Sequence, residues 1–127
     1  MSQAGVVIIG NGVAGITTAR HLRKNDRKVS ITVISAESEY FFSRTALMYV
    51  YMGHMKFEHI KPYEDWFWKK NRIDLVFDYV EEVLVEEKKL RLRSGKVLPY
   101  GKLVVASGSR PRFFDWPGQD LDGVQGL

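Results

Sequence analysis

Three glycines near the N-terminus, Gly10, Gly12 and Gly15, have the GxGxxG spacing of a phosphate-binding loop. In such a loop the first glycine permits a tight turn, the second lets the backbone approach a pyrophosphate, and the third lets a helix pack closely on a strand. The backbone N–H groups of Val13 and Ala14 would meet the phosphate charge at the start of that helix. The spacing predicts a dinucleotide site; the alternative is a glycine-rich turn that holds no ligand.

The segments on either side of the glycines supply the context that this motif needs. Residues 4–9 (AGVVII) form a short β-branched run that is typical of a buried parallel strand. Helical spacing of apolar residues follows over residues 13–24, and residues 29–34 (VSITVI) predict a second strand. Together they make a right-handed βαβ unit. We therefore expect the glycines at the turn from the first strand into the helix.

A ribose-binding carboxylate is expected at the end of the second strand, about 20 residues after the glycines. Glu37 lies 22 residues after Gly15, whereas Ser35 occupies the more usual position. We choose Glu37 as the ribose ligand; the alternative is a solvated loop carboxylate like Glu39. Because an acidic group here would repel a 2′-phosphate, NADP is disfavoured as the ligand of this site.

The pattern of the remaining sequence changes from helical to extended. Residues 44–52 and 62–71 predict two short helices. Further strands are expected over residues 73–77, 80–86, 89–93, 97–98 and 103–106. This order predicts an α/β protein with a Rossmann-like fold, in which an antiparallel β-meander is inserted into a parallel sheet.

Composition narrows the classes of function. The chain has 127 residues, 45% of them apolar and 27% charged, as expected for a single globular domain. Since cysteine is absent, disulfides, thiolate metal sites and cysteine redox chemistry are excluded. The net charge is only +4 and the basic residues are spread along the sequence, so no nucleic-acid partner is expected. The three histidines are scattered, so no metal site is expected either.

Two features of the sequence bear on membrane association. Apolar runs are too short to span a bilayer and the N-terminus lacks the pattern of a signal peptide, so we expect a cytoplasmic location. The aromatic segment from Tyr63 to Trp68 is interpreted as helix core, or as a patch that further chain covers. A flavin-stacking or membrane-docking role for this segment is the alternative.

Three blocks of sequence carry a resemblance to a known family. They are residues 6–23 (VVIIGNGVAGITTARHLR), 40–49 (YFFSRTALMY) and 98–112 (LPYGKLVVASGSRPR). The chain resembles the N-terminal part of the pyridine nucleotide-disulfide oxidoreductase superfamily, and is most similar to its branch of rubredoxin, ferredoxin and nitrite reductase flavoproteins and apoptosis-inducing factor. The resemblance implies an FAD/NAD(P)-binding fold. The first and third blocks indicate an FAD domain rather than an NAD domain.

The resemblance also implies roles for residues of the first two blocks. Gly10, Gly12 and Gly15 would face the pyrophosphate of FAD, and Glu37 would hold its adenosine ribose. Arg44 matches an arginine that reaches the cofactor in the reductase branch. Thiol-dependent branches have a single cysteine at that position, so the resemblance implies flavin electron transfer without cysteine chemistry.

Later positions match the family less completely. Val80 matches a position whose backbone contacts adenine, and Ser107 and Gly108 match the end of the family's YDxLVIATGxxPR strand. Arg110 lies where the reductase branch has basic residues near the cofactor. Ser107 replaces the usual threonine and keeps a hydroxyl, whereas Gly101 replaces the usual aspartate and removes one loop contact.

The resemblance leads to an expectation for the whole chain. Residues 1–127 would be the N-terminal portion of an FAD-binding domain, without the NAD-binding domain and the rest of the FAD domain. The complete enzyme would pass electrons from NAD(P)H, its co-substrate, through FAD to an acceptor that the sequence does not name. No catalytic residue is assigned. Uncovered sheet edges suggest a homo-oligomer. The alternative is a non-catalytic nucleotide-binding or interaction module.

Overall fold

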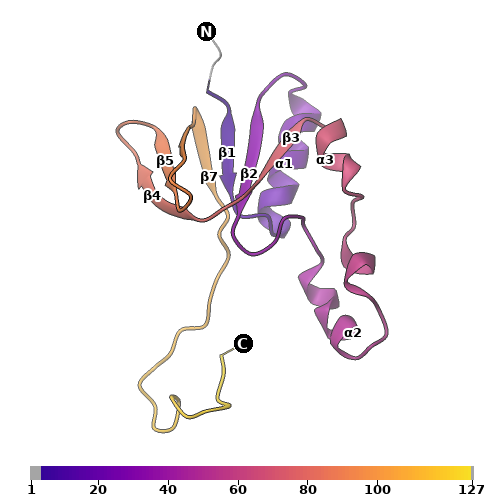
Figure 1. Ribbon diagram of the computed structural model, residues 1–127, viewed down its shortest axis with the longest axis vertical. Coiled ribbons are helices and arrows are strands. Elements are labelled where there is room, and N and C mark those ends of the chain that lie inside the picture. The colour runs from indigo at the N-terminus through magenta and orange to yellow at the C-terminus, as the bar shows by residue number, and fades with distance from the viewer. Residues whose placement is uncertain (1–3, 127) are drawn as a thin grey trace.

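The computed structural model describes residues 4–126, and its centre is a parallel sheet of four strands (Figure 1). The strand order is β3-β2-β1-β7, so β1 has β2 on one side and the last strand on the other. Strands β1, β2 and β3 follow one another in sequence, whereas β7 arrives only after the meander. The strands are β1 (Val6–Ile9), β2 (Ile31–Ser35), β3 (Ile73–Phe77) and β7 (Lys102–Val105).

Helix α1 (Val13–Asn25) connects β1 to β2 and completes the predicted βαβ unit. It packs on the sheet through Gly15, Ile16 and Ala19, whose small or branched side chains permit a close approach. Strand β2 begins two residues later than its sequence predicts. The reason is a turn at Asp26. Its carboxylate accepts hydrogen bonds from the N–H groups of Lys28 and Val29, so these residues cannot yet pair with a neighbouring strand.

Short helical segments link β2 to β3. They are a 3₁₀ turn (Arg44–Ala46), α2 (Leu47–Tyr51), a second 3₁₀ turn (Phe57–Ile60) and α3 (Trp66–Lys70). The predicted helix over residues 62–71 is therefore only five residues long. Residues 62–65 form bends and a turn before it, and Tyr63 packs on Phe67 with ring centroids 4.5 Å apart.

The meander is a second, antiparallel sheet of three strands, β4 (Val80–Leu84), β5 (Lys89–Leu92) and β6 (Val97–Pro99). A β-bulge between Val80 and Glu82 places two consecutive glutamates on the exposed face. Glu81 pairs with Arg93 and Glu82 with Arg91 across the hairpin. The expected fold class, a parallel sheet with an antiparallel meander, is confirmed.

The two faces of the parallel sheet belong to two separate hydrophobic clusters. Residues of β1 alternate between them: Val6 and Ile8 pack with α1 and α3, while Val7 packs with the meander. Trp68 is 3% exposed in the first cluster, and Phe67 and Tyr63 pack against it. The aromatic segment is thus mostly core, as first interpreted, while Trp66 remains exposed.

After β7 the chain leaves the sheet and forms no further helix or strand among the described residues up to 126 (Figure 1). Within the described residues, the helices are all too short or too polar to cross a membrane.

Candidate dinucleotide-binding site

The glycine loop lies at the carboxyl edge of the parallel sheet. Because the strands are parallel, β1, β2 and β7 all end at this edge. The N–H of Gly10 donates to the Ile34 carbonyl at 2.7 Å, and the N–H of Ala106 donates to the Ile9 carbonyl at 2.8 Å. The loop is therefore held between the ends of both neighbouring strands, where the strand order reverses direction and open α/β sheets bind ligands.

The structure explains the absence of a side chain differently at each of the three glycines. Gly10 has a φ of +109°, and a Cβ there would lie 2.1 Å from the Ala106 carbonyl oxygen. A Cβ on Gly15 would lie 1.9 Å from the Gly10 carbonyl oxygen, so the helix packs closely only without a side chain. At Gly12, by contrast, a Cβ would meet nothing within 4 Å. The fold needs Gly10 and Gly15, whereas the open space at Gly12 is available to a ligand.

The N-terminus of α1 opens onto the same space. Gly12 is its N-cap residue; the cap has no side-chain hydrogen bond, and the first turn of this helix has no acidic residue. Val13 is 73% exposed and Ala14 is exposed as well. The first N–H groups of the helix, with their partial positive charge, are therefore accessible to an anion. A phosphate group fits both the open space and this charge.

A buried asparagine joins the glycine loop to the loop after β2. The Nδ2 group of Asn11, which is 8% exposed, donates to the Ser38 carbonyl at 3.0 Å. The hydroxyl of Ser35 in turn accepts hydrogen bonds from the N–H groups of Glu37 and Ser38. Ser35 is buried and used in this turn, so the exposed Glu37 is the better placed of the two for a ribose. Asn11 and Ser38 were not predicted as site residues; a polar residue inside the glycine motif was the available signal.

Arg44, in the 3₁₀ turn after β2, lies beside Glu37. Its guanidinium forms an ion pair with the Glu37 carboxylate, and both side chains are more than half exposed. The structure thus brings together two predicted site residues seven positions apart. A cation beside this carboxylate can also attract a phosphate or another anion.

Two of the other predicted residues, Val80 and Ser107, lie near the carboxyl edge of the sheet. The N–H of Asp78 donates to the Ser35 carbonyl at 2.9 Å, which places the half-buried Val80 just beyond the ends of β2 and β3. Ser107 follows β7, and its Cα would lie 3.3 Å from a Cβ on Gly10.

The exit segment departs from this edge. Gly108 has a φ of +79°, a turn that suits glycine, and it directs the chain away from the sheet. Arg110 lies farther along this exposed segment, and the described residues show no ion pair or hydrogen bond between its side chain and the glycine loop. The structure therefore does not bring Arg110 to the other site residues.

The described residues at this edge offer groups that can bind an anion and a sugar. The described residues 4–126 contain no group of three or more residues that could hold a metal ion. The N-terminus of α1 and the open space at Gly12 suit a phosphate, and the ion pair of Glu37 with Arg44 suits a hydroxylated sugar beside it. Fold and site together define a protein of the dinucleotide-binding class.

Comparison with known proteins gives the family. A family model described as pyridine nucleotide-disulphide oxidoreductase matches residues 4–127. The chain belongs to this family. It is 32% identical over 120 residues to the ferredoxin–NAD(+) reductase subunit of the benzene 1,2-dioxygenase system of Pseudomonas putida. It is 35% identical over 125 residues to an NADH oxidase of Methanocaldococcus jannaschii.

A comparison with solved structures also finds reductases of this kind. A ferredoxin reductase from Rhodopseudomonas palustris matches with a TM-score of 0.82 and 31% identity, covering 94% of this chain and 30% of the other. The two curated relatives are matched over 94% and 93% of this chain but only 29% and 28% of their own lengths. The chain therefore spans less than a third of the proteins that it resembles.

Proposed function

We propose that the chain binds the ADP half of FAD and forms the N-terminal portion of the FAD-binding domain of an NAD(P)H oxidoreductase. The observation that carries the proposal is the open space at Gly12, directly in front of the uncapped start of α1. A dinucleotide-binding fold that packs its other two glycines tightly but leaves this one free has room for a pyrophosphate. The family and the Rossmann-like strand order support the same ligand.

Each predicted residue has a role in this proposal. Gly10 and Gly15 shape the loop, while the N–H groups of Val13 and Ala14 hold the pyrophosphate. Glu37 accepts hydrogen bonds from the ribose hydroxyls.

The residues around the loop complete the binding site. Arg44 balances the charge of the Glu37 carboxylate and reaches the phosphates. The backbone at Val80 contacts adenine. Ser107 and Gly108 form the wall beside β7. Arg110 would reach the cofactor only with the exit segment turned back toward this edge, because the structure leaves it away from the other site residues.

Bound FAD would supply the chemistry, accepting a hydride from NAD(P)H and releasing electrons to an acceptor. This chain binds and orients the cofactor, and it contributes no cysteine to the reaction. The relatives are named for different activities, ferredoxin reduction and NADH oxidation, so the proposal leaves the acceptor open. A cytoplasmic location and a homo-oligomeric state belong to the same proposal. Cell fractionation and light scattering would test them.

Titration of the chain with FAD, ADP and FMN tests the proposal. FAD and ADP share the pyrophosphate and adenosine, whereas FMN has the flavin without them. We expect ADP to compete with FAD and FMN to bind at least about tenfold more weakly, since FMN lacks the groups that the loop and Glu37 hold. Equal affinity for FMN and FAD, or FAD binding that ADP does not displace, would overturn the assignment.

A further inference from the structure

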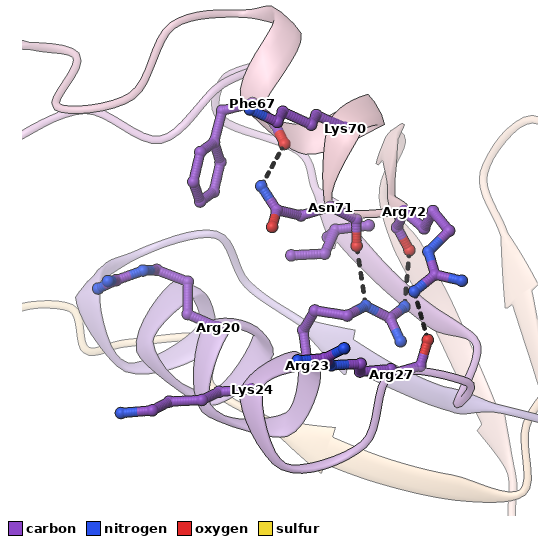
Figure 2. Close-up of a pocket in the computed structure, with 9 residues that line it drawn as sticks. Arg20, Arg23, Lys24, Arg27, Phe67, Lys70, Asn71 and Arg72 are labelled. Atoms are coloured by element: carbon purple, nitrogen blue, oxygen red, sulfur yellow. Dashed lines mark hydrogen bonds between the residues drawn. The ribbon is translucent and has the colours of Figure 1, made fainter.

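A cavity at the opposite end of α1 is lined by six basic residues. Its volume is about 410 Å³, and Figure 2 shows the side chains that line it. The cavity lies where α1 ends and where α3 leads into β3. We call it the basic pocket, and its lining is Arg20, Arg23, Lys24, Arg27, Phe67, Lys70, Asn71, Arg72 and Ile73.

Two of the six basic residues form the frame of the pocket. The guanidinium of Arg23 donates to the carbonyl oxygens of Asn71 and Arg72, each at 2.8 Å (Figure 2). It also donates to the carbonyl oxygen of Asp26 at 3.1 Å. Arg72 has a φ of 54°, a left-handed conformation that is uncommon outside glycine, and its own guanidinium donates to the Arg27 carbonyl. These bonds fix the wall of the pocket and leave its other cations free.

The four remaining cations line the cavity without an acidic partner. Among the described residues, none of Arg20, Lys24, Arg27 and Lys70 forms an ion pair. Arg20 and Lys70 lie over aromatic rings, 5.1 Å from the centroids of Tyr63 and Trp66 respectively. These contacts orient the two side chains but neutralise no charge.

The surroundings do not balance the charge of the pocket. The carboxylates that act on Arg23 are Asp26 and Asp74, and that of Asp26 already accepts two backbone N–H groups. The C-terminal ends of α1 and α3 each contribute at most about half a negative charge. Against the two carboxylates that act on Arg23 and the two helix ends, the six cations leave an excess of about three positive charges. Burial and the neighbouring Arg72 also lower the pKa of Arg23.

We propose that the basic pocket binds a small anion that carries several phosphate groups. Guanidinium groups bind phosphate oxygens in pairs, and an excess of about three charges matches a di- or triphosphate better than a single carboxylate. The cavity has the volume of a small-molecule site, and its basic residues come from α1, from α3 and from the turns that follow them. A nucleic acid or an acidic protein would need an extended basic surface instead.

The site is separate from the glycine loop. The loop lies at the N-terminal end of α1 and the pocket at its C-terminal end, about 20 Å away for a helix of 13 residues. The proposal therefore does not depend on FAD binding.

Calorimetric titration of the 127-residue chain with inorganic tripolyphosphate tests the proposal. The test variant is Lys24→Gln with Lys70→Gln, which removes two cations of the pocket. The control is Lys28→Gln with Lys69→Gln, which removes the same charge from exposed neighbours outside the lining. We expect affinity to fall at least about tenfold in the test variant and less than about twofold in the control.

Each other outcome would overturn the proposal. Equal losses in the two variants would show a response to net charge only. Loss of tripolyphosphate binding in Gly12→Val would place the anion at the glycine loop. Binding of a polyglutamate peptide without binding of tripolyphosphate would assign the pocket to an acidic protein. If tripolyphosphate shows no saturable binding to the chain, the pocket is not a polyphosphate site.

Discussion

Gly12→Val separates the binding role of the glycine loop from its role in the fold. The backbone at Gly12 has φ −74° and ψ −172°, an extended conformation that valine adopts without strain. The new Cβ would meet no protein atom within 4 Å. The side chain would instead fill the space in front of the first N–H groups of α1, where we place the pyrophosphate.

Gly12→Val should change the stability of the fold little and the affinity for FAD strongly. Replacing glycine by an apolar residue at an N-cap costs up to about 1 kcal/mol of folding stability, partly offset by the lower entropy of the unfolded chain. Displacing the pyrophosphate removes at least two charge-assisted hydrogen bonds, each contributing about 1.5–3 kcal/mol. FAD affinity should therefore fall by about 100-fold or more.

Gly15→Ala is the matched control, because its methyl group would lie 1.9 Å from the Gly10 carbonyl oxygen. It should destabilise the fold by about 1–3 kcal/mol or more through overpacking. Urea unfolding, followed by circular dichroism of the backbone, measures stability, and FAD titration measures affinity. The reasoning is refuted if Gly12→Val keeps full FAD affinity, or if it loses stability as much as Gly15→Ala does.

Three further changes test the site and the core. Glu37→Gln should weaken FAD binding roughly 5- to 30-fold in the same titration, whereas unchanged affinity would move the ribose ligand elsewhere. Trp68→Ala should cost about 3–5 kcal/mol in urea unfolding and Trp66→Ala much less, since the first is 3% and the second 57% exposed; equal losses would contradict the packing. Interaction with the Ser94 side chain lowers the pKa of Asp78 below 3.8, so its stabilisation is present above that pH and is lost on acidification. Asp78→Asn should therefore be less stable than the wild type at pH 7, and the difference should shrink as the pH falls below 3.8; a pH-independent difference would contradict this.

The βαβ unit and the meander could be predicted because their signals are local. The apolar run of β1, the helical spacing of α1 and the Ser-Gly turn at residues 94–95 each lie within a few residues. The glycine motif then fixes the place of the site, since a strand must come before it and a helix after it. Errors occurred at element ends, where side chains such as Asp26 compete with strand pairing.

Contacts between distant residues could not be predicted in this way. The hydrogen bond of Asn11 to Ser38 spans 27 positions, and that of Arg23 to Asn71 spans 48. The spread of basic residues along the sequence predicted no binding site, but the structure gathers six of them in one pocket. Four of the six lie within residues 20–27, but only the fold places Lys70 and Arg72 beside them, and a one-dimensional pattern does not contain that information.

Helix α1 offers anions two different kinds of site at its two ends, and salt should distinguish them. At the glycine loop the donors are backbone N–H groups that carry partial charges, whereas the basic pocket presents full charges on side chains. Screening weakens interactions between exposed full charges most, with a Debye length of about 10 Å at 0.1 M and 3 Å at 1 M. Raising the salt concentration should therefore weaken tripolyphosphate binding more steeply than ADP binding, as titrations over a salt series would show. Parallel slopes would mean that both anions bind the same donors, and the assignment of two sites to one helix would then be wrong.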